Sequence, residues 1–323
     1  MGQEDVTEEN SLQSAIQSLN DTIEEIGKFY VGNMANVRAI IGAIIASGHV
    51  LLEDFPGVGK TFLAKLIART LGLDYNRIQF TPDLLPGDIT GTKIWRPAIG
   101  KFEKNMGPIN SNLILADEIN RAPPKTQAAL LEGMEEKQVT IEGETVKLPQ
   151  PFIVLATQNP IEFEGTYPLP EAQMDRFMIR TNLGYPEDEG ELLTRRISWQ
   201  NDDPSFSARK VLDRDKLVEI RTLLEKKVYV SREIIDYIVG FSACRKDSRV
   251  LAGPSPRGLI SMLRMSRAVA MLEGRDFVTP DDVKLVAVET LAHRIVLKPE
   301  VALDQVDSAS VVREYLEKLA VPR

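Results

Sequence analysis

The sequence is poor in the residues that build disulfides and metal centres. It contains one cysteine, Cys244, and two histidines, His49 and His293. A single thiol cannot form an internal disulfide or a cysteine-built zinc site, and two imidazoles are too few for a histidine-rich centre. These shortages exclude a disulfide framework and a metal site made of several soft ligands.

Long apolar segments are also missing. The longest run, residues 40–46, is far shorter than the roughly 18 residues that a membrane helix needs. The first ten residues include Glu4, Asp5, Glu8 and Glu9, whereas a signal peptide starts with basic residues. We therefore expect a cytoplasmic protein without a membrane-spanning segment.

Basic charge is in short supply as well. The chain has 39 Lys and Arg against 47 Asp and Glu, a net charge of −8, which argues against a broad nucleic-acid-binding surface. The net charge leaves open a local stripe of basic residues that binds nucleic acid. Hydrophobic residues at 43% and charged residues at 27% are typical of a globular protein. At 323 residues the chain is longer than one that usually folds around a single hydrophobic core, so we expect two domains.

Apolar spacing predicts an N-terminal helix followed by a sheet. An apolar stripe with 4-3-4-3 spacing predicts a helix within residues 1–30 that packs on its own domain, because two heptads are too few for a coiled coil. The stripe consists of Leu12, Ile16, Leu19, Ile23 and Ile26. Short apolar runs then alternate with helical patterns, as in parallel strands buried on both faces. We expect strands at residues 50–52, 78–80, 113–116, 152–156 and 177–179.

Strand signals stop after Pro186, and helical patterns follow. Ser231 precedes an apolar helical pattern, and Thr279-Pro280-Asp281-Asp282 combines a cap, a first-turn proline and carboxylates at the positive end of the helix dipole. The sequence therefore predicts an α/β fold. A doubly wound parallel sheet occupies residues 31–186, and a small all-helical domain occupies residues 187–323.

A glycine-rich turn joins the first expected strand to a helix. Its residues are Pro56-Gly57-Val58-Gly59-Lys60-Thr61, followed by Phe62 in the helix. In this context glycines let backbone N–H groups approach phosphate oxygens. Lys60 would bridge the β- and γ-phosphates of ATP, and the Thr61 hydroxyl would ligate Mg²⁺. Glycine commonly stands six residues before the lysine; here Asp54 stands there, and we expect its carboxylate to face outward or contact the loop's own backbone.

Two later strands end in polar residues. Residues 113–116 lead into Asp117 and Glu118, and residues 152–156 lead towards Asn159. Strand carboxyl ends face the ligand crevice of an open α/β sheet. Asp117 can therefore hold Mg²⁺, Glu118 can polarise the attacking water, and Asn159 can orient that water. The alternative for Asn159 is an Asx turn before Pro160. The adjacent carboxylates favour hydrolysis over phosphate transfer to a metabolite.

Together these motifs resemble the AAA+ ATPases, and more closely the MoxR family. The most specific stretch is LADEINRAPPKTQ, residues 115–127. ATQNP at residues 156–160, DRF at residues 175–177 and SPR at residues 255–257 extend it. The resemblance implies a homo-oligomeric ring, usually hexameric, with ATP between subunits. It also implies that the family tolerates Asp54 in the loop.

The resemblance suggests roles for residues outside the loop. Arg176 is similar to the arginine finger that a subunit supplies to its neighbour's ATP, with Arg121 and Arg180 as alternatives. Arg257 is similar to sensor 2, which reaches the γ-phosphate from a helical lid. The adenine would be lined by the segment containing Val31 and Gly32.

Two irregular segments resemble insertions of the same family. Residues 81–107 are too rich in glycine and proline for a plain helix and resemble the helix-2 insert. Residues 137–149 alternate around Glu142-Gly143-Glu144, which predicts a hairpin that resembles the pre-sensor-1 hairpin. Trp95 is a candidate for gripping a substrate, although a core position is favoured.

Three classes of function stay open. The leading hypothesis is an ATPase that remodels client proteins or metal-cofactor enzymes in a chaperone-like way, with ATP, Mg²⁺ and, by resemblance, a von Willebrand factor A domain partner. A GTPase or small-molecule kinase is the second, but no Asn-Lys-x-Asp motif is present. The third is a nucleic-acid motor. The predicted hairpin disfavours it, because the positive charges of Lys137 and Lys147 are balanced by the negative charges of Glu142 and Glu144.

Overall fold

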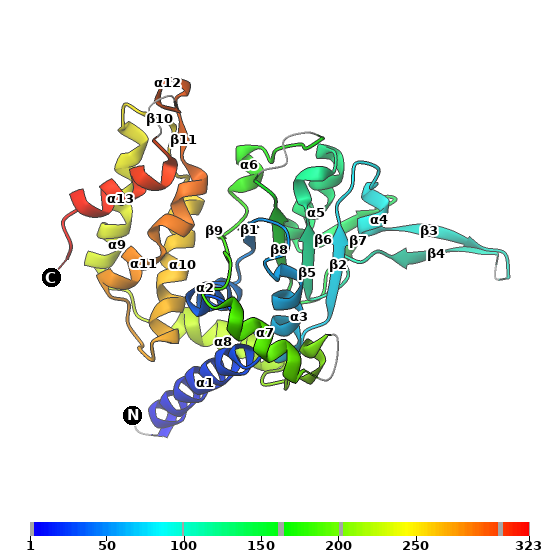
Figure 1. Cartoon of the computed structure of the whole chain (residues 1–323), viewed down its shortest axis with the longest axis horizontal. Coiled ribbons are helices and arrows are strands. Elements are labelled where there is room, and N and C mark those ends of the chain that lie inside the picture. Colours follow the sequence, from blue (N-terminus) through cyan, green and yellow to red (C-terminus); the bar gives the residue numbers. More distant parts are fainter. Residues whose placement is uncertain (1–2, 99, 161–164, 200–202, 303–305, 323) are drawn as a thin grey trace.

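The computed structural model describes residues 3–98, 100–160, 165–199, 203–302 and 306–322. Its centre is a five-stranded parallel sheet in the order β2-β5-β8-β1-β9 (Figure 1). The strands are β1 (Val50–Glu53), β2 (Tyr75–Gln79), β5 (Leu113–Asp117), β8 (Ile153–Gln158) and β9 (Ile179–Thr181). The predicted parallel α/β sheet is confirmed, with strand positions within a few residues of those expected.

Helices cover both faces of the sheet because its strands are apolar on both sides. Alternate strand residues point to opposite faces. Leu113 and Leu115 join one buried cluster, whereas Ile114 and Ala116 join another. The first cluster includes residues of α1 (Gln3–Gly27), α2 (Met34–Ile45) and α3 (Lys60–Thr70), and the second includes residues of α5 (Pro124–Glu136).

The predicted N-terminal helix packs within its own chain. All five residues of its apolar stripe are buried. Helix α1 contacts α2 and α3 of the sheet domain, and it also contacts α8 (Arg214–Lys227) and α10 (Pro256–Leu272). It therefore bridges the two parts of the molecule.

A helical lid follows the sheet domain, as predicted. Ser231 and Thr279 cap their helices as expected, and Asp282 completes a capping box with Thr279. The lid helices are α9 (Arg232–Gly240), α10, α11 (Pro280–Leu291), α12 (Pro299–Ala302) and α13 (Ser308–Lys318), with the short strands β10 (Val250–Ala252) and β11 (Val296–Leu297). These lie on one side of the sheet, whereas α7 (Glu189–Ser198) and α8 lie near α1 (Figure 1). The domain boundary at Pro186 stays a prediction.

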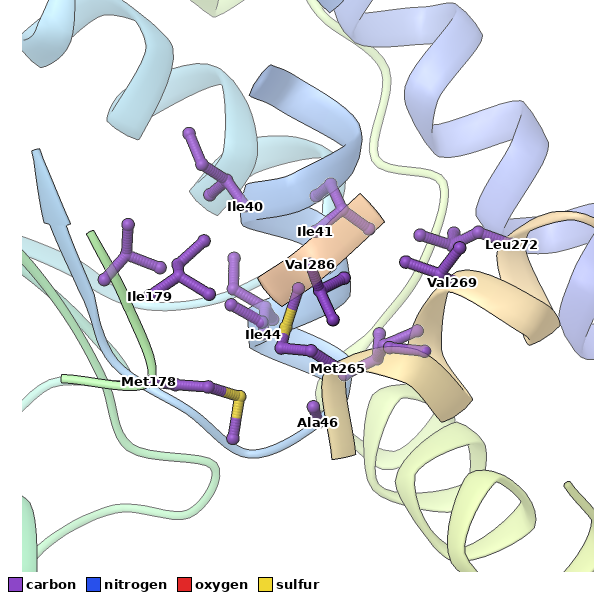
Figure 2. Close-up of a cluster of buried hydrophobic side chains, with 14 of the residues drawn as sticks. Ile40, Ile41, Ile44, Ala46, Met178, Ile179, Met265, Val269, Leu272 and Val286 are labelled. Carbon is purple, nitrogen blue, oxygen red and sulfur yellow. The ribbon is translucent and has the colours of Figure 1, made fainter. Parts of the chain in front are cut away.

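An apolar junction joins the lid to the sheet domain. Ile41 and Ile44 of α2 belong to one buried cluster with Ile179 of β9 and the lid side chains Met265 and Val286 (Figure 2). All five are buried. The apolar run at residues 40–46 is thus accounted for by this junction. Within the described residues, no helix combines the length and the apolar character needed to cross a bilayer.

Two β-hairpins are inserted into the sheet domain. Strands β6 (Gln138–Ile141) and β7 (Glu144–Lys147) form the predicted one. Its turn residues Glu142 and Gly143 have φ of 45° and 83°, as a two-residue type I′ turn requires. Residues 81–107 form a short helix, α4 (Pro86–Thr90), and a second hairpin that the sequence did not predict, β3 (Gly91–Arg96) with β4 (Lys101–Met106).

The two hairpins are tied together by charge. Glu144 of β7 accepts hydrogen bonds from Lys104 and, at 2.6 Å, from Lys93. These lysines hold the pKa of Glu144 at about 2. Further out, Trp95 contacts Phe102 with ring centroids 5.1 Å apart and is 50% exposed. The favoured core position for Trp95 is therefore wrong, because this hairpin extends away from the sheet domain (Figure 1).

Candidate functional site

The glycine-rich turn between β1 and α3 presents its backbone to solvent. Gly57 and Gly59 have φ of 88° and 85°, in the left-handed region that favours glycine, and open space lies where a Cβ would stand at either residue. Gly59 caps α3 without a side-chain hydrogen bond. The first-turn N–H groups of α3 are therefore available to an external anion.

One cavity of about 430 Å³ collects most of the predicted site residues. Its lining residues are Pro56, Gly57, Gly59, Lys60, Thr61, Phe62, Arg77, Asp117, Glu118 and Asn159. They come from the turn and from the carboxyl ends of β2, β5 and β8. Val58 of the turn is instead buried at 8% exposure in the core that contains α3. The turn is thus anchored by Val58 while its other residues face the cavity.

Asp117 is held from two sides. Its Oδ1 accepts a 2.6 Å hydrogen bond from the buried Thr157 hydroxyl, and its Oδ2 accepts two from Arg77, at 2.6 and 3.1 Å. Arg77 lies on β2, which pairs with β5. Sequence reasoning missed Arg77. The signal was available, since Arg77 and Gln79 are polar positions that alternate with the buried Ile78 and Phe80.

Glu118 lies directly after β5 in a left-handed conformation, with φ of 55°. Its backbone N–H donates to the Thr157 hydroxyl at 2.8 Å. Its Oε2 accepts hydrogen bonds from Gln79 at 2.8 Å and from Arg121 at 3.0 Å. Held by these contacts, Glu118 lines the cavity together with Lys60 and Asn159.

The Asp54 carboxylate adopts neither of the two predicted orientations, since it is buried instead of facing outward and it does not contact the backbone of its own loop. Its carboxylate is buried at 4% exposure and accepts backbone N–H donors from Leu183 and, at 3.2 Å, from Gly184, after β9. It therefore contacts the segment that leaves the sheet, not its own loop. Its backbone carbonyl accepts a 2.9 Å hydrogen bond from Lys60. Burial lowers the pKa of Lys60, and nearby carboxylates partly offset that effect.

Replacing Asp54 with alanine is expected to lower the free energy of unfolding by about 1–3 kcal/mol, because two buried N–H groups lose their acceptor. Urea denaturation would measure the change. Asp215→Ala is the matched control, since its side chain is 89% exposed. Equal stability of the two variants would contradict a structural role for Asp54.

Val31 and Gly32 do not line the cavity. They follow the buried Tyr30 in the turn before α2, and a Cβ on Gly32 would lie 2.6 Å from the Tyr30 hydroxyl. Burial, and to a smaller degree the charge of Asp54, raises the pKa of Tyr30 to about 12. The segment is thus close to Asp54 at the base of the loop, and its contact with adenine stays a prediction.

Arg176 and Arg257 lie together at the other edge of the sheet. Met178 donates to the carbonyl of His49, directly before β1, so this segment is at the amino ends of the strands. Arg176 contacts Glu135 of α5 at 2.9 Å, and Arg257 of α10 contacts the same carboxylate at 2.7 Å. The structure therefore does not bring Arg257 to the phosphate cavity of its own chain. In this arrangement Arg257 does not act as a sensor 2 residue for a nucleotide bound to its own subunit.

The two alternative arginines lie elsewhere. Arg121 contacts Glu118 of its own cavity, 3.0 Å away. Arg180 of β9 contacts Glu53 at 3.4 Å. Both therefore lie near the loop edge of the sheet, whereas Arg176 lies at the edge away from it.

The cavity fits a nucleotide with Mg²⁺. The open loop backbone suits phosphate, and the Thr61 hydroxyl and Asp117 carboxylate are hard oxygen ligands of the kind that Mg²⁺ prefers. In the part of the chain that the structure describes, no group of three or more His, Cys, Asp or Glu side chains could hold a metal. Thr61 and Asp117 would therefore supply part of the coordination, and phosphate and water the rest.

Comparison with known proteins supports the same interpretation. Residues 49–179 match the ATPase family associated with various cellular activities (AAA), and residues 242–315 match the AAA lid domain. The crystal structure of an ATPase candidate from Cytophaga hutchinsonii is similar, with a TM-score of 0.92 and 41% identity over 100% of both chains.

Relatives are similar over nearly the whole chain. Uncharacterized protein YeaC of Bacillus subtilis is 43% identical over 94% of this chain and 95% of that protein. Chaperone MoxR1 of Mycobacterium tuberculosis is 39% identical over 97% of this chain and 84% of that protein. Protein MoxR of Methylorubrum extorquens is 32% identical over 85% of this chain and 86% of that protein. By its cavity, its lid and these relatives, the chain belongs to the MoxR family of AAA+ ATPases.

Proposed function

We propose that this protein hydrolyses ATP to ADP and phosphate as a subunit of a homo-oligomeric ring. One observation carries the proposal. The phosphate loop and the strand-end carboxylates line one cavity, whereas Arg176 and Arg257 lie together at the opposite edge of the same sheet. A chain cannot bring these arginines to its own cavity without rearranging the sheet domain, but an adjacent subunit can present them to it.

Each residue of the cavity has a proposed task. Lys60 and the loop N–H groups bind the β- and γ-phosphates, and Thr61 and Asp117 hold Mg²⁺, which neutralises charge on the phosphates. Glu118 accepts a proton from the attacking water, and Asn159 orients that water. The two carboxylates are held by different hydrogen-bond donors, Asp117 by Thr157 and Glu118 by Gln79, which suits them to separate tasks.

Arg176 is the finger that we propose, and its position at the edge away from its own cavity favours it over the other two candidates. Arg121 is already paired with the catalytic glutamate of its own chain, and Arg180 is paired with Glu53. Arg176 and Arg257 share Glu135, which neutralises the repulsion between them. We propose that both exchange Glu135 for the γ-phosphate of the neighbouring subunit.

The ring proposal predicts a concentration-dependent enzyme. Because the arginines and the cavity of one site come from two chains, activity per subunit should rise steeply over the range in which the ring assembles. Steady-state hydrolysis measured over a dilution series, with light scattering for mass, tests this. Flat activity per subunit across that range would contradict a shared site.

Chaperone-like remodelling of client proteins is the biological role that we propose. The name of the M. tuberculosis relative, Chaperone MoxR1, supports it. We extend the proposal to a hexameric ring in the cytoplasm, with a von Willebrand factor A domain protein as partner, on the resemblance alone. Nucleic acid is a poor fit as the client, since Lys93 and Lys104 of the β3–β4 hairpin are already paired with Glu144.

Arg77 predicts how the enzyme responds to Mg²⁺. It donates two hydrogen bonds to Asp117, so a metal held through Asp117 must compete with it. Arg77→Met should lower the Mg²⁺ concentration for half-maximal hydrolysis by roughly two- to tenfold, since a partly exposed pair is worth about 1 kcal/mol. Titration of Mg²⁺ at saturating ATP measures it, with Arg232→Met on α9 as control. An unchanged or higher requirement would remove Arg77 from this role.

A further inference from the structure

The segment that contains Arg176 is held by the lid as well as by the sheet domain, where the Arg176 side chain contacts Leu131 and Glu135 of α5. Arg294 lies in the short 3-10 turn that follows α11, and its side chain is only 2% exposed. Its guanidinium donates to the Asp175 carboxylate at 2.7 Å. It also donates to the backbone carbonyls of Asp175 at 3.0 Å, of Phe177 at 2.6 Å and of Met178 at 3.2 Å. One lid arginine thus binds the residues on both sides of Arg176.

The donors of Arg294 are fully used. The remaining contacts of its guanidinium go to the Thr290 carbonyl and the Ser261 hydroxyl within the lid. These six acceptors use all five N–H donors of the planar guanidinium, with two acceptors sharing one donor of Nη2, whereas an ammonium has three donors and no fixed plane. The stem is fitted just as closely, because a Cβ on Gly258 would lie 2.8 Å from the Arg294 Cδ.

A second lid residue binds the same aspartate. Ser255 caps α10, and its hydroxyl lies 3.0 Å from both carboxylate oxygens of Asp175. Arg257 stands two residues further along α10, where it shares Glu135 with Arg176. The two arginines of this edge are therefore connected through the lid as well as through Glu135.

We propose that Arg294, together with Ser255, is a positioning residue that fixes Arg176 to the lid, so that Arg176 and Arg257 approach the neighbouring subunit's ATP as one body. This inference rests on the proposed function of Arg176 as the trans finger. If Arg176 and Arg257 move together with the lid, a displacement of the lid in one subunit changes the rate of hydrolysis in the neighbouring subunit.

The experiment uses mixed rings to separate the two sides of a site. A Glu118→Gln chain keeps its finger and lacks the base; an Arg176→Ala chain keeps its base and lacks the finger. Their mixture regains hydrolysis only at interfaces where the Glu118→Gln chain supplies its finger to the cavity of an Arg176→Ala chain. Arg294→Lys is then added to either chain of the pair. On the finger donor it should lower the recovered kcat roughly tenfold or more, because small misplacement of a catalytic group is costly. On the acceptor it should leave the recovered rate at the parental level.

If Arg294 only stabilised the fold, its substitution would not reduce the recovered rate in the finger donor alone. A folding defect would reduce the recovered rate from either chain, and equal losses would overturn the proposal. Ser255→Ala, which removes one hydroxyl, serves as the milder variant if Arg294→Lys fails to fold, with the same donor-only loss expected at about twofold. A donor variant that rescues as well as its parent would also overturn it. Absence of rescue in the parental mixture would instead contradict the proposed trans role of Arg176, and the positioning role would fall with it.

Discussion

Glu118→Gln is expected to bind ATP normally and to lose roughly 10²–10⁴-fold in kcat, the usual contribution of a general base. The structure explains why binding should survive. Gln79 and Arg121 both donate to the same oxygen, Oε2 of Glu118. The amide oxygen of glutamine can accept both bonds, so the side chain can keep its place while it loses the ability to take a proton from water.

Two measurements are needed for this variant. Fluorescent-nucleotide titration gives the affinity, and phosphate release gives the rate. Glu219→Gln on α8 is the control, since it makes the same chemical change in a side chain whose partner is Lys216. If Glu118→Gln failed to bind nucleotide, Glu118 would be a structural residue of the cavity; if it hydrolysed ATP at the wild-type rate, another residue would be the base.

The sheet could be predicted because its strands satisfy one simple requirement. A parallel strand covered by helices on both sides has to be apolar at every position, and residues 113–116 and 152–156 are. The polar residues that follow these runs then meet at the carboxyl edge. Asp117, Glu118 and Asn159 reach the cavity for that reason, and the structure places them with Lys60.

Features that depend on strand register or domain orientation could not be predicted. The local pattern marks Arg77 as a polar strand position, but its contact with Asp117 arises because β2 pairs with β5 in a particular register, and the local sequence does not reveal that register. The location of Arg257 depends on how the lid packs, and an apolar junction between α2 and α10 decides that. Trp95 was misplaced since an aromatic residue in a two-stranded hairpin has the same local pattern as one in a core.

Arg176→Ala has the second large expected effect, a loss of roughly 10³-fold or more in kcat with little change in ATP affinity. Arg176 does not line the cavity of its own chain, so its loss leaves the local nucleotide contacts intact. Arg121→Ala should behave differently. Arg121 contacts Glu118 within one chain, so its effect should be the same whether or not rings are mixed. Arg232→Ala, with a side chain that is 78% exposed on α9, is the control.

Mixing identifies the finger, because complementation requires the missing group to come from another chain. In a random equal mixture of Glu118→Gln and Arg176→Ala chains, about a quarter of the interfaces pair an intact finger with an intact base. If the interfaces act independently, the mixture should recover up to that fraction of the wild-type rate, while each variant alone stays inactive. A mixture of Glu118→Gln with Arg121→Ala should recover nothing beyond the activity of its parts. The reverse pattern would assign the finger to Arg121 and leave Arg176 as a partner of Glu135.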